Sequence, residues 1–365
     1  MPRPARVPLG VWLLLVCTAA GTQPLPAITL ARTPPAARTT WAVPATPFTR
    51  VDTVALGGSA QTHVVARSDG GLALALGAPP RLVLLSAEGQ PEATLPLEAV
   101  PVGISPIDRG AVLLDDRAGQ TLRVSADGAL RAVSAFFAAQ EPGPWVALAD
   151  GGAVRLAGLD ARTVLQRVDA RGHGLFTRAV PMRVTQPAAL SDGAMVYAAQ
   201  RNLVRCEADG TWRRVPSVPG VRSVVALDDG GLALATDDGV YFARGDGTPG
   251  TRVGLDAAPH RIDAAPDGGV VATLLGTPPR AVRIDRDGTV RWRVPLASAD
   301  VSYHFDRSGA ALVLGATGAL RALAPDGSER WQLGLNTRVL LPAVVNAVGT
   351  LLVATTRGDL IRLRP

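Results

Sequence analysis

One pattern recurs through almost the whole chain: a turn glycine followed at once by a burst of apolar residues. DGGLALAL begins at Asp69, DGGLALAT at Asp229 and DGGVVATLL at Asp267. A fixed period is the signature of a repeat architecture in which each unit is one supersecondary structure. The leading glycines follow one another at intervals of 37 to 42 residues and are Gly70, Gly110, Gly151, Gly193, Gly230, Gly268, Gly309 and Gly349.

Each of these eight units contains short apolar stretches separated by tight turns. The second turn of a unit reads Asp-Gly or a close variant, as in RDG ending at Gly288 and PDG ending at Gly327. Asp-Gly between two β-rich runs predicts a hairpin, because both central residues of such a turn need positive φ. Four short strands per unit and no helical pattern predict an all-β fold, an eight-bladed β-propeller.

The eighth unit stops after three strands. Its apolar stretches read LLPAVVNA, TLLVATT and DLIRLR, and the chain then ends at Pro365. The missing fourth strand is expected from the other terminus, where TTWAVPAT around Trp41 resembles the fourth strands around Trp292 and Trp331. Pairing of this N-terminal strand with the last blade would close the ring without an open gap.

We therefore predict a single propeller domain over residues 38–365, with eight four-stranded blades. Seven blades is the alternative, because the unit from Ala153 to Val180 is weakly marked and could be irregular. The fourth strands carry Trp212, Trp292 and Trp331, which are expected to pack one blade against the next, since a large ring fills the widening outer gap.

The N-terminus has the pattern of a secretory signal. MPRPAR carries positive charge, VPLGVWLLLVCTAA is an apolar core too short to span a bilayer, and small residues precede Gly21. We expect residues 1–20 to be a signal peptide cleaved near Ala20 and residues 21–37 to be a flexible lead-in. The mature protein is then periplasmic or secreted. Lipidation of Cys17 is the alternative.

The charge of the chain does not indicate a nucleic-acid partner. All 37 basic residues are arginines, the formal net charge is +6, and the arginines are spread singly instead of forming a block or stripe. After cleavage only Cys206 remains, within the alternating run LVRCE, where a buried strand cysteine is expected. A single cysteine permits neither an internal disulfide nor a thiol metal site.

Fourth strands such as DGSERW and DGTVRW, after strands such as LVLGATGALRALAPDG, resemble the degenerate repeat of pyrroloquinoline-quinone (PQQ)-type β-propellers. The resemblance covers nearly the whole mature chain as a repeat pattern. That family includes quinoprotein dehydrogenases and cofactor-free propellers such as the outer-membrane assembly lipoprotein of bacterial envelopes, and the length here suits the second kind. The dehydrogenases use an adjacent cysteine pair, which this chain lacks. The resemblance therefore implies the fold, no cofactor is predicted, and PQQ is an alternative without supporting residues.

Few residues suggest catalysis. The chain has no nucleophile elbow, phosphate-binding loop, HExxH or CxxC motif. His63, His260 and His304 all fall in the first strand of a unit, which lines the central channel of a propeller, and Arg261 and Asp263 share the strand of His260. These five residues are candidates for a metal or substrate site in the channel, but single polar residues also suit a wet channel wall.

The sequence thus favours a monomeric, extracytoplasmic, non-catalytic propeller that binds or scaffolds an envelope or secreted protein. Association with a membrane would then come through that partner. The alternative is an enzyme with its site at the channel, either a quinoprotein-like oxidoreductase or a hydrolase or lyase.

Overall fold

The computed structural model describes residues 41–57, 63–133, 141–148, 150–159, 162–180, 187–346 and 349–365. The expected signal peptide, the lead-in and Cys17 lie outside these ranges. Within them no helix is long and apolar enough to cross a membrane. The one helical element of this part of the chain is a single 3-10 turn, η1 (Asp108–Gly110).

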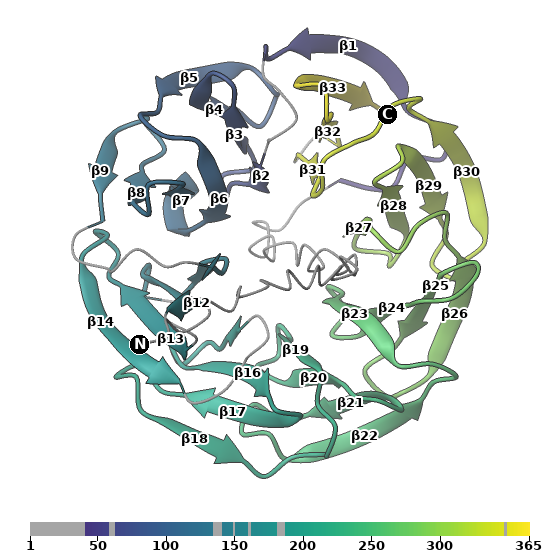
Figure 1. The fold of residues 1–365 in the computed structure, drawn as a ribbon. Coiled ribbons are helices and arrows are strands. Elements are labelled where there is room, and N and C mark those ends of the chain that lie inside the picture. The colour runs from purple at the N-terminus through teal and green to yellow at the C-terminus, as the bar shows by residue number, and fades with distance from the viewer. Residues whose placement is uncertain are drawn as a thin grey trace, which may run out of the picture.

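Eight antiparallel sheets are arranged in a ring, and the chain passes from each sheet to its neighbour (Figure 1). This confirms the predicted eight-bladed propeller. We number the blades from 1 to 8 along the chain. In each blade the first strand is innermost and the fourth is at the rim.

The strands of the first four blades lie between His63 and Val215. Blade 1 contains β2 (His63–Ala66), β3 (Leu72–Gly77), β4 (Pro80–Leu85) and β5 (Pro91–Pro96). Blade 2 contains β6 (Pro101–Pro106), β7 (Val112–Asp116), β8 (Thr121–Val124) and β9 (Leu130–Ala132). Blade 3 contains β10 (Glu141–Pro142), β11 (Val146–Ala147), β12 (Ala153–Leu159), β13 (Arg162–Val168) and β14 (Gly174–Val180). Blade 4 contains β15 (Ala188–Ala189), β16 (Met195–Ala199), β17 (Asn202–Cys206) and β18 (Trp212–Val215).

The other four blades follow the same plan. Blade 5 contains β19 (Ser223–Ala226), β20 (Leu232–Ala235), β21 (Gly239–Ala243) and β22 (Pro249–Gly254). Blade 6 contains β23 (Pro259–Ala264), β24 (Val270–Leu274), β25 (Arg280–Ile284) and β26 (Val290–Pro295). Blade 7 contains β27 (Val301–Phe305), β28 (Ala311–Gly315), β29 (Ala319–Leu323) and β30 (Glu329–Gly334). Blade 8 contains β31 (Val344–Val345), β32 (Leu351–Ala354), β33 (Asp359–Arg364) and β1 (Thr49–Ala55).

The third blade is irregular, as its weak sequence marking suggested, but it is a complete blade. Its innermost position is shared by two two-residue strands, β10 and β11, which both pair with β12. The seven-bladed alternative is therefore wrong.

An N-terminal strand closes the ring, but it is not the strand that we expected. β1, and not the stretch around Trp41, pairs antiparallel with β33 (Figure 1). Trp41 precedes this strand, has no strand partner and is buried in the core that blades 7 and 8 share. Its likeness to the fourth-strand tryptophans reflects a shared need to bury an indole ring, which the sequence does not distinguish from strand pairing.

The segment before β1 completes the rim next to blade 7. The Trp331 indole donates a hydrogen bond from Nε1 to the carbonyl oxygen of Pro44 (2.8 Å), and Phe48 meets the same ring edge-on at 5.6 Å between centroids. The backbone N–H of Val43 donates to Asp306 Oδ2 at 2.8 Å. The first described residues and the C-terminal strand are thus both part of the last two blades.

The apolar core lies between neighbouring blades. All six residues of β3 are buried, because a second strand is covered by a blade on either side. The predicted turn glycines adopt positive φ, as at Gly70 (φ 86°) and Gly327 (φ 85°). At Gly327 there is also no room for a side chain, since an added Cβ would lie 2.4 Å from the Cβ of Trp292 in the preceding blade. The second turn of a blade therefore packs on the fourth strand of the blade before it.

Candidate functional site

The three candidate histidines lie on the inner strands of three different blades. His63 begins β2 of blade 1, His260 lies on β23 of blade 6, and His304 lies on β27 of blade 7. His260 is exposed, whereas His63 and His304 are half-buried. In the described part of the chain, no three His, Cys, Asp or Glu side chains are grouped as metal ligands would be. The structure therefore does not bring these histidines together as one ligand set.

The surroundings of His63 and His304 favour the neutral imidazole. Burial lowers the pKa of His63, and burial lowers the pKa of His304 to about 4. The Oγ of Ser302 lies 3.1 Å from Nε2 of His304. Because β27 pairs with β28 in strict alternation, Ser302 and His304 share the face of the strand opposite to that of Tyr303.

Arg261 and Asp263 do come together. The Nε of Arg261 donates to Asp263 Oδ1 at 3.0 Å. Nη1 of Arg261 donates to the carbonyl oxygen of Val301 in blade 7, also at 3.0 Å. Beside them the hydroxyls of Thr273 and Tyr303 lie 2.9 Å apart. These contacts join the inner strands of blades 6 and 7. In the structure, Arg261 and Asp263 thus hold blade 6 against blade 7. An activity at the channel stays a prediction.

A repeated Arg–Asp pair, which sequence reasoning missed, joins the third strand of a blade to its first turn. Arg167 contacts Asp150 at 2.5 Å in blade 3, and Arg205 contacts Asp192 at 2.6 Å in blade 4. Blade 6 repeats the pair with Arg283 and Asp267. The signal lay in the repeat itself, since each arginine is two residues before the second turn begins. Three of the arginines that look scattered along the sequence thus hold the first turn of their own blade.

A second missed group lies buried between blades 2 and 3. Arg155 donates to Asp115 at 2.6 Å and to Gln166 at 2.7 Å, and its guanidinium lies 4.4 Å from the centre of the Trp145 ring. Arg155 is only 2% exposed. A buried arginine needs such partners, because an isolated charge is costly to remove from water.

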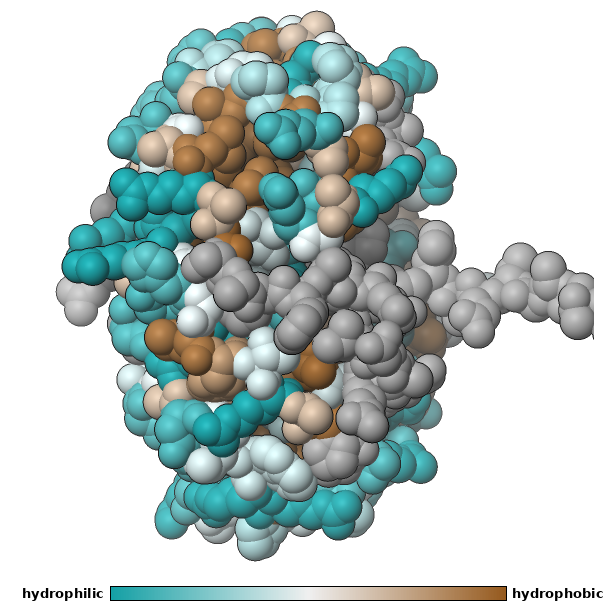
Figure 2. Space-filling view, turned by 60° about the vertical axis from the view of Figure 1, so that its left-hand side comes forward, coloured by the Kyte–Doolittle hydropathy of each residue, from teal (hydrophilic) through white to brown (hydrophobic). Residues whose placement is uncertain are grey.

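Exposed apolar side chains gather on one part of the rim. The large hydrophobic residues that are exposed in the described chain are Leu130 (40%), Leu175 (53%), Trp212 (40%) and Leu275 (55%). The first three stand at or next to the beginning of the outer strands of three consecutive blades, 2, 3 and 4. Figure 2 turns this side of the ring toward the viewer and shows brown apolar patches set among teal polar ones. We call Leu130, Leu175 and Trp212 the rim patch.

Arginines are close in sequence to the residues of the rim patch. They follow the apolar residues on the same three outer strands and are exposed: Arg131, Arg178, Arg213 and Arg214. The guanidinium of Arg178 lies 5.5 Å from the centre of the Phe176 ring on β14. Tryptophan and arginine together are typical of the energetically dominant residues of protein interfaces.

The position of Trp212 corrects the expectation that all fourth-strand tryptophans pack between blades. Trp292 and Trp331 are 6% and 7% exposed and do so. In β26 a register shift places Trp292 opposite Arg283. In β18 the pairing is regular, so that Trp212 stands opposite Cys206 and Arg213 takes the position opposite Arg205. A slip of one residue turns a side chain to the other face of a strand, and Trp212 accordingly points to solvent.

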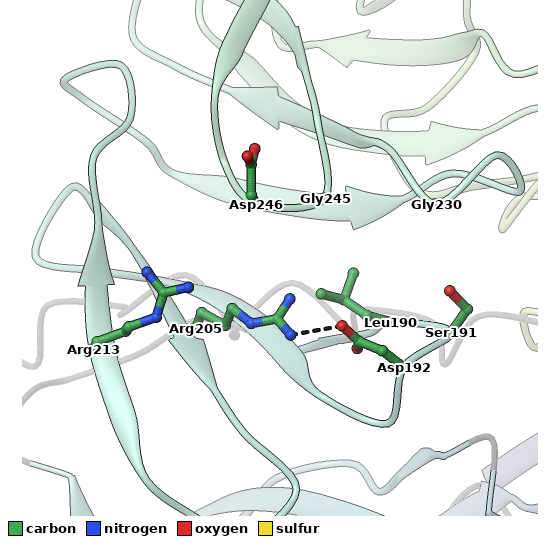
Figure 3. A pocket seen from close by; sticks show the side chains of 8 residues that line it. All are labelled: Leu190, Ser191, Asp192, Arg205, Arg213, Gly230, Gly245 and Asp246. Atoms are coloured by element: carbon green, nitrogen blue, oxygen red, sulfur yellow. Dashed lines mark hydrogen bonds and ion pairs between the residues drawn. The ribbon is translucent and has the colours of Figure 1, made fainter.

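A pocket of about 390 Å³ lies at the seam between blades 4 and 5, on the turn-bearing face (Figure 3). Blade 4 contributes its first turn, one arginine of β17 and one arginine of β18, and blade 5 contributes its two turns. The lining residues are Leu190, Ser191, Asp192, Arg205, Arg213, Gly230, Gly245 and Asp246. Figure 3 shows Arg205 directed at Asp192, while the carboxylate of Asp246, on the opposite wall, points away from the two arginines.

The charges in this pocket are not equally satisfied. Arg205 contacts Asp192 at 2.6 Å and Glu207 at 2.7 Å, and these carboxylates, Glu207 foremost, raise its pKa. Arg213 has a side chain that is 58% exposed, and its nearest carboxylate, Glu207, is 4.0 Å away. The pocket therefore contains one arginine with two close carboxylate partners and one, Arg213, whose single carboxylate partner is more distant.

The comparisons with known proteins agree with the propeller fold. No protein-family model matches the chain, and no curated protein sequence is significantly similar to it. Among solved structures, BamB from Moraxella catarrhalis is similar with a TM-score of 0.62 at 14% identity, over 88% of this chain and 98% of that one. Sqt1 from Saccharomyces cerevisiae is similar with a TM-score of 0.61 at 11% identity, over 87% and 97% of the two chains.

A lyase is also among the similar structures. The catalytically inactive virginiamycin B lyase from Staphylococcus aureus, solved with quinupristin, has a TM-score of 0.52 at 12% identity, over 86% of this chain and 98% of that one. At such identities each likeness concerns the fold alone. Propellers serve unrelated functions, so function must be argued from the residues of this chain.

Proposed function

We propose that this chain is a non-catalytic, protein-binding propeller that acts as a scaffold in the cell envelope, outside the cytoplasm. The observation that carries the proposal is the rim patch. Of the four large hydrophobic side chains that are exposed in the described residues, three stand at or next to the start of the outer strands of consecutive blades, and exposed arginines follow them on these strands. Isolated apolar residues are ordinary on a surface, but a grouped set with Trp and Arg is typical of a binding site.

Two further observations support the envelope setting. The first 20 residues have the pattern of a secretory signal, and the fold is similar to that of BamB. The resemblance of the repeat to PQQ-type propellers points the same way, toward the cofactor-free kind. We propose on these grounds that the partner is itself an envelope or secreted protein.

The test is a crosslinking pull-down from an envelope fraction, with a tag-only control. The triple variant Leu130→Ser, Leu175→Ser, Trp212→Ser removes the rim patch, and Leu275→Ser, the fourth exposed hydrophobic residue, is the matched control on blade 6. We expect the wild type and Leu275→Ser to retain the same small set of proteins. The triple variant should retain at most about one tenth of the amount of these proteins.

Urea unfolding of each variant establishes that the fold is intact, since surface substitutions of this kind change stability by only about 0.5 kcal/mol each. Retention of the same set by the triple variant would contradict the proposal. So would the absence of any set that exceeds the tag-only control.

A further inference from the structure

Within the described residues, the fourth strand of blade 3 has no strand partner on its outer edge. β14 stands at the end of its sheet and pairs only with β13 (Figure 1). No backbone–backbone hydrogen bond in this part of the chain joins it to another element, and five of its seven residues are exposed. An edge strand presents a row of N–H and C=O groups to solvent, because alternate residues point these groups away from the sheet.

Most of the other outer strands carry a feature that hinders the addition of a further strand. A proline has no N–H to donate, and a short strand offers few groups. The outer strands of blades 1, 5 and 6 contain Pro96, Pro249 and Pro295, respectively. The outer strands of blades 2 and 4, β9 and β18, have only three and four residues. In blade 7 the segment before β1 packs against β30.

β14 has none of these features. It is seven residues long, reads GLFTRAV and contains no proline. Its register shift comes near its start, at Leu175, and Phe176–Val180 then pair with β13 without a break. In β1, which has the same length, a register shift after Arg50 leaves only Asp52–Ala55 in consecutive pairs. A long, uninterrupted edge is the form that accepts a strand from another chain.

The charge around β14 indicates what kind of strand would fit. β9, β14 and β18 together contain four exposed arginines and no Asp or Glu: Arg131, Arg178, Arg213 and Arg214. Carboxylates of blade 4 balance part of this charge. The N–H of Thr211 first, and Arg178 to a smaller extent, lower the pKa of Asp209. Glu207 lies 4.0 Å from Arg213 but also pairs with Arg205. The surface beside the edge therefore stays positive.

We propose that the partner protein adds an extended, acidic segment to the outer edge of β14, as a further strand of blade 3. This inference rests on the proposed function and names the mode of binding. Main-chain hydrogen bonds would supply affinity, and acidic side chains beside Arg178 would supply specificity. A second copy of this chain fits less well, because a two-fold interface brings a surface against itself and would set these arginines against one another.

The test uses the full chain and the fluorescein-labelled peptide acetyl-Glu-Val-Thr-Val-Glu-Val-Glu-amide, observed by fluorescence anisotropy at low ionic strength. We expect saturable binding by the wild type. Arg178→Glu should weaken it about three- to tenfold, whereas Arg293→Glu, the same change on the proline-containing strand β26, should not. Methylation of every peptide N–H should weaken binding to the wild type by about 100-fold, because the main-chain donors are lost.

Hydrogen exchange followed by mass spectrometry locates the added strand. The bound peptide should slow amide exchange in Gly174–Val180 and leave Val290–Pro295 unchanged, an effect that contacts through side chains alone would not produce. Absence of saturable binding, equal binding of the methylated peptide, or unchanged exchange in β14 would overturn the inference. So would slower exchange in β14 on raising the protein concentration without peptide, since a second copy would then occupy the edge.

The pull-down separates this result from the fate of the proposed function. If the triple rim variant loses the partner set while Arg178→Glu retains it in full, the strand-addition inference fails and the scaffold proposal stands. If the triple variant retains the set, the scaffold proposal fails, whatever the peptide does.

Discussion

The seam between blades 4 and 5 and the seam between blades 6 and 7 are two versions of one repeat. At the second, Trp292 is 6% exposed and lies beneath the turn of the next blade. At the first, Arg213 stands at the corresponding position, Trp212 is 40% exposed, and a pocket of about 390 Å³ opens. Both outer strands contain a Trp next to an Arg, yet the ring packs between blades at one seam and is exposed at the other, where the turn glycine that matches Gly327, Gly247, meets Val215 instead.

The difference comes from strand register. In blade 6 a register shift between Arg283 and Ile284 brings Trp292 onto the face that meets blade 7. In blade 4 the register does not shift, and the arginine takes that face. A repeat protein can thus convert a packing residue into an exposed residue without changing its fold, because the strand stays paired in either register.

The largest expected effect separates the two tryptophans. Trp292→Ala should lower the free energy of unfolding by about 3–5 kcal/mol, because it leaves a cavity between two blades. Trp212→Ala, which removes the same side chain from an exposed site, should change it by no more than about 0.5 kcal/mol. Urea unfolding of both variants measures the difference. Equal losses would mean that the two seams are packed alike.

Acid should lower the free energy of unfolding, because β27 carries the buried side of His304 on its face next to blade 8. Its pKa of about 4 lies below the ordinary 6.5, so the unfolded chain binds the proton more readily than the folded chain. Stability is then present above pH 6.5 and is lost as the pH falls toward 4, by about 3 kcal/mol in total.

His304→Gln is the control for this loss. Carboxylates also titrate in this range, but they do so equally in both proteins, so the difference between the two unfolding curves isolates the histidine. We expect the difference to change by about 3 kcal/mol between pH 7 and pH 4. A constant difference over that range would show that His304 has an ordinary pKa.

The smallest effect concerns the turns. Gly327 and Gly230 have nearly the same positive φ, 85° and 79°, but an added Cβ meets Trp292 at 2.4 Å in the first case and no atom within 4 Å in the second. Gly327→Ala should therefore lower the free energy of unfolding, measured with urea, by about 1–2 kcal/mol more than Gly230→Ala does. Equal costs would mean that backbone conformation alone, and not the approach to Trp292, requires glycine.

The sequence predicted what depends on local residue chemistry. The turn glycines adopt the positive φ that Asp-Gly turns require, and their spacing gave the number of blades. Cys206 is buried in its strand, as the alternating run LVRCE indicated. These features follow from short stretches of chain and need no knowledge of neighbouring strands.

What the sequence did not reveal depends on register and on neighbours. Trp41 was assigned to a fourth strand from its likeness to the strands of Trp292 and Trp331, and Trp212 was expected to pack between blades, but the first pairs with no strand and the second points outward. A shift of pairing by one residue reverses which face a side chain occupies, and it leaves no mark in composition or spacing. The pocket could not be predicted for the same reason, since Arg213 stands opposite Arg205 and lines it only in the register that β18 adopts.

The most direct test of this account is the free energy of unfolding of a variant in which the two residues exchange places, Trp212→Arg with Arg213→Trp. The composition and charge are unchanged, so only the face that carries the ring differs. We predict that the free energy of unfolding, measured with urea, increases by about 1–2 kcal/mol, because the ring moves from an exposed site into the pocket. An unchanged or lower stability would contradict the claim that strand register, by deciding which face of the strand carries the ring, decides whether the ring packs between blades.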